Sequence, residues 1–200
     1  RITVAHSLRF SPRFCQAEVA VRNGAIGDIR HIYSKRNPSH QSVKRVLGKF
    51  PLEYWLSCHD IDLMRWILQD EVESVYAISR NGLQSDDDYL LATLKFRSGV
   101  SAIHEVSWCS PPLSSLASSC VFSMKGTQGL IEVNDSDQDV RIFQRENQVS
   151  SPDTYEFYSV AGEHYGLFHN LVNGWIRSLQ TGKSTYPSFD DARKAVLVCS

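Results

Sequence analysis

A series of short segments in which apolar and polar residues alternate fills the middle of this 200-residue chain. Residues that favour turns, such as Asn81-Gly82 and Pro111-Pro112, separate the segments from one another. The segments are Val72–Arg80, Tyr89–Phe96, Val100–Trp108, Leu116–Met124, Leu130–Val133 and Val140–Gln144. Connections this short leave no room for the crossover helices that parallel neighbours require. The pattern therefore predicts an antiparallel sheet.

Helical patterns flank this region. A helix is expected from Ser11-Pro12, with proline at the first helical position, to the stop signal Asn23-Gly24. A strand at Asp28–Asn37 and a helix at about Leu52–Gln69 follow. Together the elements predict an α+β fold, an open and mostly antiparallel sheet with helices packed on one face. The aromatic and β-branched content of the other face favours a partner that covers it.

A later helix carries a continuous apolar stripe. After Ala161-Gly162, apolar residues recur at spacings of three and four until Thr181-Gly182. The stripe consists of Tyr165, Phe168, Val172, Trp175 and Leu179. Because surface helices normally bury such a stripe, we expect this helix to pack against the sheet.

Composition narrows the class of protein. A formal net charge of −1 argues against binding driven by charge to nucleic acid or to an anionic membrane. The sequence contains no apolar run of membrane-spanning length and no signal-peptide pattern. Its cysteines lack paired metal-ligand spacing, so reduced thiols in a cytoplasmic protein are expected. They are Cys15, Cys58, Cys109, Cys120 and Cys199.

Both ends of the chain fall within patterned segments. The run Ile2–Ala5 has the character of a strand, and the helical pattern Asp190–Cys199 ends without glycine or proline. We therefore expect this chain to be a piece of a longer protein.

The run Trp55–Trp66 places one histidine and two carboxylates in an otherwise apolar segment. At helical pitch, His59 shares a face with Asp62 and Trp66. Such a histidine is a candidate for proton transfer. The alternative is a hydrogen-bonded core histidine, which residue types alone favour.

Other motifs that would indicate a function are either absent or allow two interpretations. The sequence has no Gly-x-Gly-x-x-Gly fingerprint, no phosphate-binding loop and no Gly-x-Ser-x-Gly elbow. A metal at His59 and Asp62 would need a further ligand such as His40 or His104, so no metal site is predicted. Lys35 and Asn37 end a strand, where they either bind a polyhydroxylated substrate or are simply solvated.

Four ordered segments together resemble one family. Val4–Pro12 looks like the family's Arg-Phe-x-Pro motif, and Asn23–Ile29 is similar to its Gly-x-Ile-Gly segment. His59–Trp66 matches its His-Asp-x-Asp helix, and Gly126–Ile131 resembles its Gly-x-x-Gly hairpin. The family is the glucose–fructose oxidoreductase/inositol dehydrogenase (Gfo/Idh/MocA) group of NAD(P)-dependent sugar and cyclitol dehydrogenases.

The resemblance implies a division of the chain. Residues 1–10 would be the last strand and exit of an N-terminal Rossmann domain that is missing here. Residues 11–200 would form the substrate-binding and oligomerisation domain, with a dihydrodipicolinate-reductase-like C-terminal fold. NAD or NADP would bind to the full-length protein, with no cofactor bound to this chain alone, which would be inactive. The substrate would be a sugar or polyol, and a homo-dimer or tetramer would form through the open sheet face.

The resemblance also implies residue roles. His59 matches the family's catalytic histidine, which would accept the hydroxyl proton during hydride transfer. Substrate contacts would come from Lys35 and Asn37, from Arg9 near the domain junction, and from Trp108 at a sheet end. Trp55 stands where many relatives carry an aspartate. This departure leaves open an alternative, a non-catalytic ligand-binding or assembly module that kept the fold.

Overall fold

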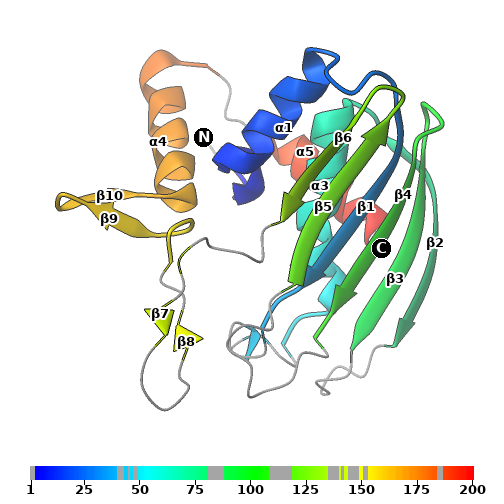
Figure 1. Cartoon of the computed structure of the whole chain (residues 1–200), viewed down its shortest axis with the longest axis horizontal. Helices are drawn as coiled ribbons and strands as arrows, with labels where there is room; N and C mark the ends of the chain where they lie inside the picture. Colours follow the sequence, from blue (N-terminus) through cyan, green and yellow to red (C-terminus); the bar gives the residue numbers. More distant parts are fainter. Residues whose placement is uncertain are drawn as a thin grey trace.

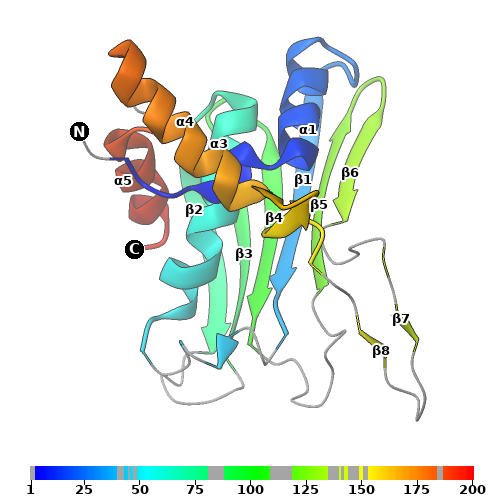
Figure 2. The ribbon, with the colours of Figure 1, turned by 90° about the vertical axis from the view of Figure 1, so that its left-hand side faces the viewer.

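A computed structural model of the chain shows a mixed sheet with helices on one side (Figures 1 and 2). In the described part of the chain this sheet has six strands in the order β2-β3-β4-β1-β5-β6. They span Ile29–Asn37 (β1), Val72–Arg80 (β2), Tyr89–Phe96 (β3), Ser101–Ser107 (β4), Ser119–Gly126 (β5) and Leu130–Asn134 (β6). The structure describes residues 3–39, 43–44, 46, 49–80, 88–108, 119–134, 140, 142–143, 149–150, 153–183 and 187–200.

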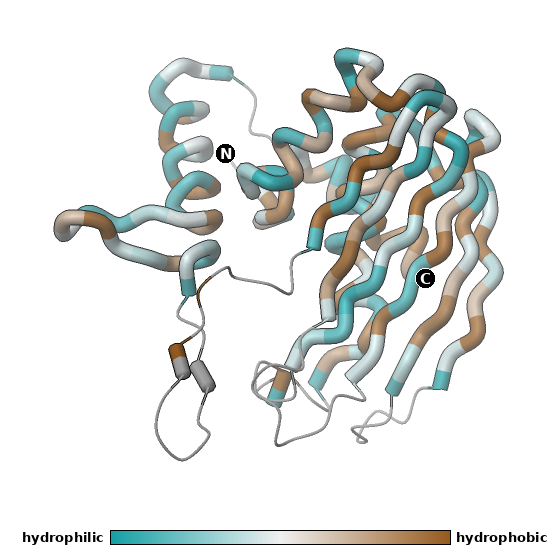
Figure 3. Tube along the Cα trace, in the orientation of Figure 1, coloured by the Kyte–Doolittle hydropathy of each residue, from teal (hydrophilic) through white to brown (hydrophobic). Residues whose placement is uncertain are grey.

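The sheet is mostly antiparallel, as the short connections predicted. Strands β2, β3 and β4 form a meander, and β5 and β6 form a hairpin. Strand β1 lies between these two units, antiparallel to β5 and parallel to β4. Apolar and polar residues alternate along these strands (Figure 3). The α+β class and the open, mostly antiparallel sheet are confirmed.

The other elements lie outside this sheet. The helices are η1, a 3-10 helix (Ser7–Phe10), α1 (Pro12–Arg22), the π-helical turn η2 (Glu53–Ser57), α3 (Cys58–Leu68), α4 (Leu167–Thr181) and α5 (Phe189–Val198). The short strand pairs are β7 (Ile142–Phe143) with β8 (Val149–Ser150), and β9 (Tyr158–Val160) with β10 (Glu163–Tyr165). Of the expected strand Val140–Gln144, the described residues include the two-residue β7, which lies outside the main sheet. None of the described helices is long and apolar enough to cross a membrane.

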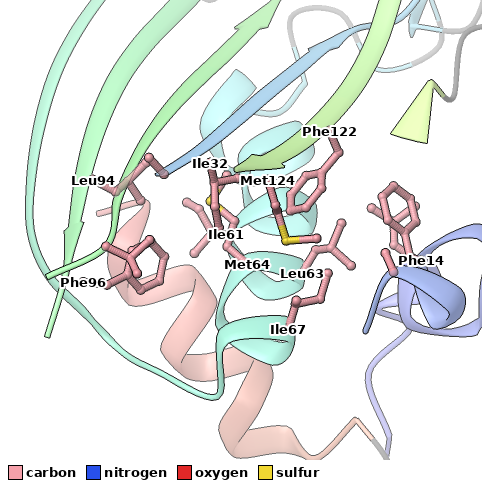
Figure 4. Close-up of a cluster of buried hydrophobic side chains, with 14 of the residues drawn as sticks. Phe14, Ile32, Ile61, Leu63, Met64, Ile67, Leu94, Phe96, Phe122 and Met124 are labelled. Carbon is pink, nitrogen blue, oxygen red and sulfur yellow. The ribbon is translucent and has the colours of Figure 1, made fainter. Parts of the chain in front are cut away.

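Helix α3 is the centre of the core. Its Ile61, Met64 and Ile67 are each less than 5% exposed and face the inner side of the sheet (Figure 4). On the sheet they meet Ile32 and Leu94, in one cluster of buried side chains. Helices α1 and α5 flank α3 on the same face of the sheet (Figure 2). Because almost every side of α3 is buried, its polar residues also lie inside the protein.

The prediction that the late apolar stripe packs against the sheet is wrong. Helix α4 stands apart from the sheet and contacts η1 and β10 (Figure 1). Its stripe residues Val172, Trp175 and Leu179 are 49%, 38% and 43% exposed. A spacing of three and four establishes an amphipathic helix, but it does not identify the surface that the apolar face meets.

The structure assigns no strand to the described residues of the expected strand at Ile2–Ala5. Residues 3–6 have no regular secondary structure, and the chain then enters η1. The N–H groups of His6 and Ser7 donate to the carbonyls of Val4 and Ala5, at 2.9 and 2.8 Å. A strand needs a neighbouring strand to pair with, and these residues have none within the described part of the chain.

Candidate active site

Two buried ion pairs hold helix α3 on opposite sides. From β1, Arg36 donates to the Asp60 carboxylate from Nε at 2.5 Å and from Nη2 at 3.1 Å. From η1, Arg9 donates to the Asp62 carboxylate from Nε at 2.7 Å and from Nη2 at 2.6 Å. Both carboxylates are only 1% exposed, and two-pronged arginine contacts of this kind restrict orientation as well as distance. The turn of α3 that carries His59 is therefore fixed to the sheet and to the N-terminal segment.

His59 lies at the beginning of α3, directly after the π-helical turn η2. The side chain is half-buried, and its Nδ1 is buried without a hydrogen-bond partner among the described residues. Its ring meets the ring of His6 edge-on, with centroids 6.4 Å apart and planes at 82°. The hydrogen-bonded core histidine that residue types favoured is therefore not what the structure contains.

The pKa of His59 is lowered to about 4, mainly by burial and in addition by the nearby Arg36 guanidinium. The Asp60 carboxylate opposes this shift, whereas His6 adds to it. The imidazole is therefore neutral near pH 7, with one ring nitrogen able to accept a proton.

His6 is a site residue that the sequence did not reveal. It is 5% exposed, and its Nδ1 lies 3.6 Å from Oδ2 of Asp62. Burial lowers its pKa, and the Asp62 carboxylate opposes that effect. No local pattern marks this position, because the tertiary contacts of η1 with α3, among them the Arg9–Asp62 pair, bring it to the site.

Lys35 and Asn37 lie on the opposite face of the sheet from His59. Three side chains of this face contact the carboxylate of Glu105. Asn37 donates to Oε1 of Glu105 at 2.7 Å, and Tyr33 donates to Oε2 of Glu105 at 3.4 Å. Nζ of Lys35 lies 3.9 Å from Oε1 of Glu105. Strand side chains alternate between faces, and Arg36 is held against α3 by Asp60. The structure therefore does not bring Lys35 and Asn37 together with His59, and Arg36 is the residue of this strand end that faces the site.

Arg9 and Trp108 are both buried. The Arg9 guanidinium is committed to Asp62, and it also lies 5.8 Å from the ring centre of Trp66. Trp108 is 2% exposed inside a second apolar cluster that includes Leu52, Leu56 and Val106. Its ring fills core space and presents no surface for a sugar in this structure.

Trp55 supplies no carboxylate at the place where the resemblance expects one. Its half-buried ring stacks on Phe50, with ring centroids 5.6 Å apart. The carboxylates of Asp60 and Asp62 follow His59 directly on α3, and both are bound by arginines.

The two glycine-containing segments of the resemblance meet each other rather than His59. The N–H of Gln128 donates to the carbonyl of Ile26 at 2.9 Å, and a Cβ on Gly126 would overlap that same carbonyl oxygen. Gly27 has a φ of +68° and packs against Thr127. These glycines permit close contact between the α1–β1 and β5–β6 turns, so they are occupied in packing and form no phosphate cradle.

The described residues contain no group of three or more histidine, cysteine, aspartate or glutamate side chains placed to hold a metal ion. His40, weighed as a ligand from the sequence, lies outside them, as does Cys109. The cysteines that the structure describes, Cys15, Cys58, Cys120 and Cys199, are free thiols.

Mild acid is expected to destabilise the fold before the carboxylates titrate. Burial lowers the pKa of His6, His59 and His104 below 6.5, so the unfolded chain binds more protons as pH falls. The stability that comes from the neutral rings is complete above pH 6.5 and is lost as pH falls, for His59 toward pH 4. Between pH 7 and pH 5, His59 alone should account for about 2 kcal/mol.

Urea unfolding across this pH range measures the loss. Replacing His104 with phenylalanine should make the pH dependence less steep, whereas His31→Gln at an exposed position should leave it unchanged. An unfolding free energy that stays constant from pH 7 to about pH 5 would contradict the prediction.

Comparison with known proteins identifies a family and a shared fold. A family model described as the GFO/IDH/MocA C-terminal domain matches residues 14–132. Among curated proteins, the uncharacterized oxidoreductase YrbE of Bacillus subtilis is 29% identical over 109 residues, which cover 51% of this chain and 32% of that protein.

Solved structures share the fold over nearly the whole chain. Scyllo-inositol dehydrogenase from Lactobacillus casei, in a crystal structure with bound NAD(H) and scyllo-inositol, matches with a TM-score of 0.70 at 17% identity, covering 98% of this chain and 60% of that one. Myo-inositol dehydrogenase from Corynebacterium glutamicum matches with a TM-score of 0.72 at 16% identity, covering 97% and 59%. This chain thus spans about three-fifths of the length of these neighbours.

Proposed function

Because this chain belongs to the GFO/IDH/MocA family through its C-terminal domain, we propose that it is the substrate-binding domain of an NAD(P)-dependent oxidoreductase acting on a sugar, cyclitol or related polyol. The observation that carries the proposal is His59, a neutral and half-buried imidazole on a helix held by two buried ion pairs. A fixed, neutral imidazole is suited to accept the proton of a substrate hydroxyl group.

The contribution of this chain is the proton-transfer step. His59 would accept the hydroxyl proton as the alcohol carbon is oxidised, and the Arg36–Asp60 and Arg9–Asp62 pairs would hold the helix that carries it. When bound, NAD(P) supplies the hydride acceptor. In the described part of this chain, the glycines of the two motif-like turns, Gly27 and Gly126, are engaged in packing. We therefore assign no hydride step to these residues.

A dinucleotide-binding domain would precede this one, and residues 1–10 would be the exit from it. The inositol dehydrogenases that share the fold are longer than this chain, which leaves space for such a domain. The Lactobacillus casei neighbour, with scyllo-inositol and NAD(H) in its structure, supports cyclitols as the first substrates to examine.

An assay of the full-length protein tests the proposal. Reduction of NAD or NADP should be detectable with at least one substrate in a panel of myo-inositol, scyllo-inositol and common hexoses. NADH titrated into this chain alone should bind more weakly than the micromolar range. Failure of every substrate, or micromolar NADH binding by the isolated chain, would reject the proposal.

One observation favours a second candidate, a ligand-binding or assembly module without catalysis. Trp55 stacks on Phe50 at the position where the resemblance expects a carboxylate. Specific polyol binding by the full-length protein without any turnover would favour this candidate.

We further propose that the open sheet face forms a homo-dimer or tetramer contact. Exposed apolar side chains lie on this face of β2, β3 and β4: Tyr76 (71%), Ile78 (52%), Leu91 (45%) and Ile103 (57%). Patches of this kind on a sheet face are typical of protein contacts.

A charge within this patch should separate the subunits. Replacing Ile103 with aspartate is expected to raise the dissociation constant at least about 100-fold, because a carboxylate would be buried without a partner. Analytical ultracentrifugation measures the change. Val19→Asp on the exposed side of α1 is the matched control and should leave assembly intact. A wild-type protein that is monomeric at high concentration would contradict the proposal.

A further inference from the structure

Two imidazoles at the site each have a buried nitrogen with no hydrogen-bond partner among the described residues. These atoms are Nε2 of His6 and Nδ1 of His59. A buried nitrogen left without a partner costs about 1–3 kcal/mol, so such groups in native proteins are usually satisfied by protein or by ordered water. The two rings belong to different segments, and they meet edge-on with centroids 6.4 Å apart.

The surroundings of His6 select one tautomer. Its Nδ1 lies 3.6 Å from Oδ2 of Asp62, whose carboxylate is held by Arg9. A carboxylate beside Nδ1 favours a proton on that nitrogen, because the N–H dipole then points toward negative charge. In the neutral ring this leaves Nε2 of His6 as a hydrogen-bond acceptor.

The separation of the rings suits a single bridging water. Each nitrogen lies about 1.2 Å from its ring centre, so the two nitrogens are between about 4 and about 9 Å apart, which is too long for a direct hydrogen bond. At the lower end of this range, where the two nitrogens face each other, one water molecule bridges the distance with two ordinary hydrogen bonds. It would donate to Nε2 of His6 and accept from Nδ1–H of His59.

We propose that His6 is the positioning residue of His59, fixing through one water the tautomer that carries its proton on Nδ1 and leaves Nε2 free to accept the substrate's proton. The proposal rests on the proposed function of His59 as the base. Within the described residues the neighbouring carboxylates are not free for this task, since Asp60 and Asp62 are bound by arginines and Trp55 brings none. His6 thus supplies the orienting acceptor that a base of this kind requires.

Other charged groups act on both rings and must be held constant in a test. Those that act on His59 are Arg36, Asp60 and His6, and those that act on His6 are Asp62, Arg9, Asp191 and Arg65. Protonation of His6 would turn its Nε2 into a donor and would break the bridge. The orienting effect is therefore expected only at a pH where His6 is neutral.

The test compares histidine tautomers in the full-length protein labelled with 15N-histidine. Wild-type His59 should be neutral near pH 7 with its proton on Nδ1. In His6→Phe, which keeps a ring but removes the acceptor, His59 should shift to the tautomer with its proton on Nε2. His6→Gln keeps an acceptor and should retain the Nδ1–H form, and it serves as the readout if His6→Phe does not fold. His31→Phe at an exposed position is the control.

Kinetics of the same variants distinguish positioning from stability. His6→Phe should lower kcat by about 10- to 100-fold with little change in KM, and His6→Gln should restore part of it. An Nε2–H tautomer for His59 in the wild type, or the same tautomer in wild type and His6→Phe, would overturn the proposal. Because the spectra need no substrate, a wild-type protein without dehydrogenase activity would reject the proposed function alone.

Discussion

Replacing His59 with glutamine in the full-length protein should lower kcat by about 10²–10⁴-fold with a selected polyol substrate. Glutamine has a similar volume and retains a polar group, but it cannot accept a proton at neutral pH. The ion pairs that hold α3 do not involve His59, so the unfolding free energy should change far less than the rate. Steady-state kinetics and urea unfolding of the same variant measure the two effects.

The pH dependence of the wild-type enzyme provides a second readout. Since burial lowers the pKa of His59 to about 4, the base remains neutral through mildly acidic solution. The acid limb of kcat/KM should therefore lie well below pH 6.5. A His59→Gln enzyme with the wild-type kcat, or an acid limb near pH 6.5 that disappears in that variant, would contradict this account. His31→Gln should behave as the wild type.

Removing the Arg9 side chain should destabilise the fold by about 3–5 kcal/mol, because it leaves the Asp62 charge buried without its partner. Asp62 is 1% exposed and Arg9 is 4% exposed, so water does not reach the unpaired carboxylate without a free-energy cost. The matched control is Arg193→Ala. Arg193 pairs with Asp190 on the surface of α5, where such pairs contribute at most about 1 kcal/mol. Urea unfolding of both variants at one pH gives the comparison.

A double variant separates the buried charge from general packing loss. Arg9→Met combined with Asp62→Leu removes both charges while keeping similar volumes, so it should recover much of the stability lost in Arg9→Ala. If Arg9→Ala is no less stable than Arg193→Ala, the Arg9–Asp62 pair does not anchor α3. If the double variant is less stable than Arg9→Ala, the loss does not arise from the unpaired carboxylate.

Local sequence patterns predicted the helices and strands themselves better than they predicted which of these elements lie side by side. The expected bounds Val72–Arg80 and Tyr89–Phe96 match β2 and β3, because alternation and turn residues are local signals. The position of β1 between β4 and β5 depends on pairing between residues far apart in the chain, for which no local signal exists. The same reason explains α4, whose apolar stripe was evident although its packing surface was not.

The candidate site shows the same division between local and tertiary information. His59 was found because a titratable group in an apolar helix is conspicuous. Arg36 was passed over in favour of Lys35 and Asn37, which are one residue away and therefore point to the other face of the strand. His6 was missed because its role depends on the approach of η1 to α3.

The central position of β1 has a consequence for how this chain acquires its structure. The hairpins on either side of β1 join residues that are close in sequence, whereas β1 pairs His31 with Ser101 and Lys125. Until β1 inserts, each half of the sheet has an unpaired inner edge, and such edges promote association between chains. Closing these long loops is slow, so β1 insertion should limit the folding rate. Aggregation during refolding should therefore depend more on β1 than on the outer strands.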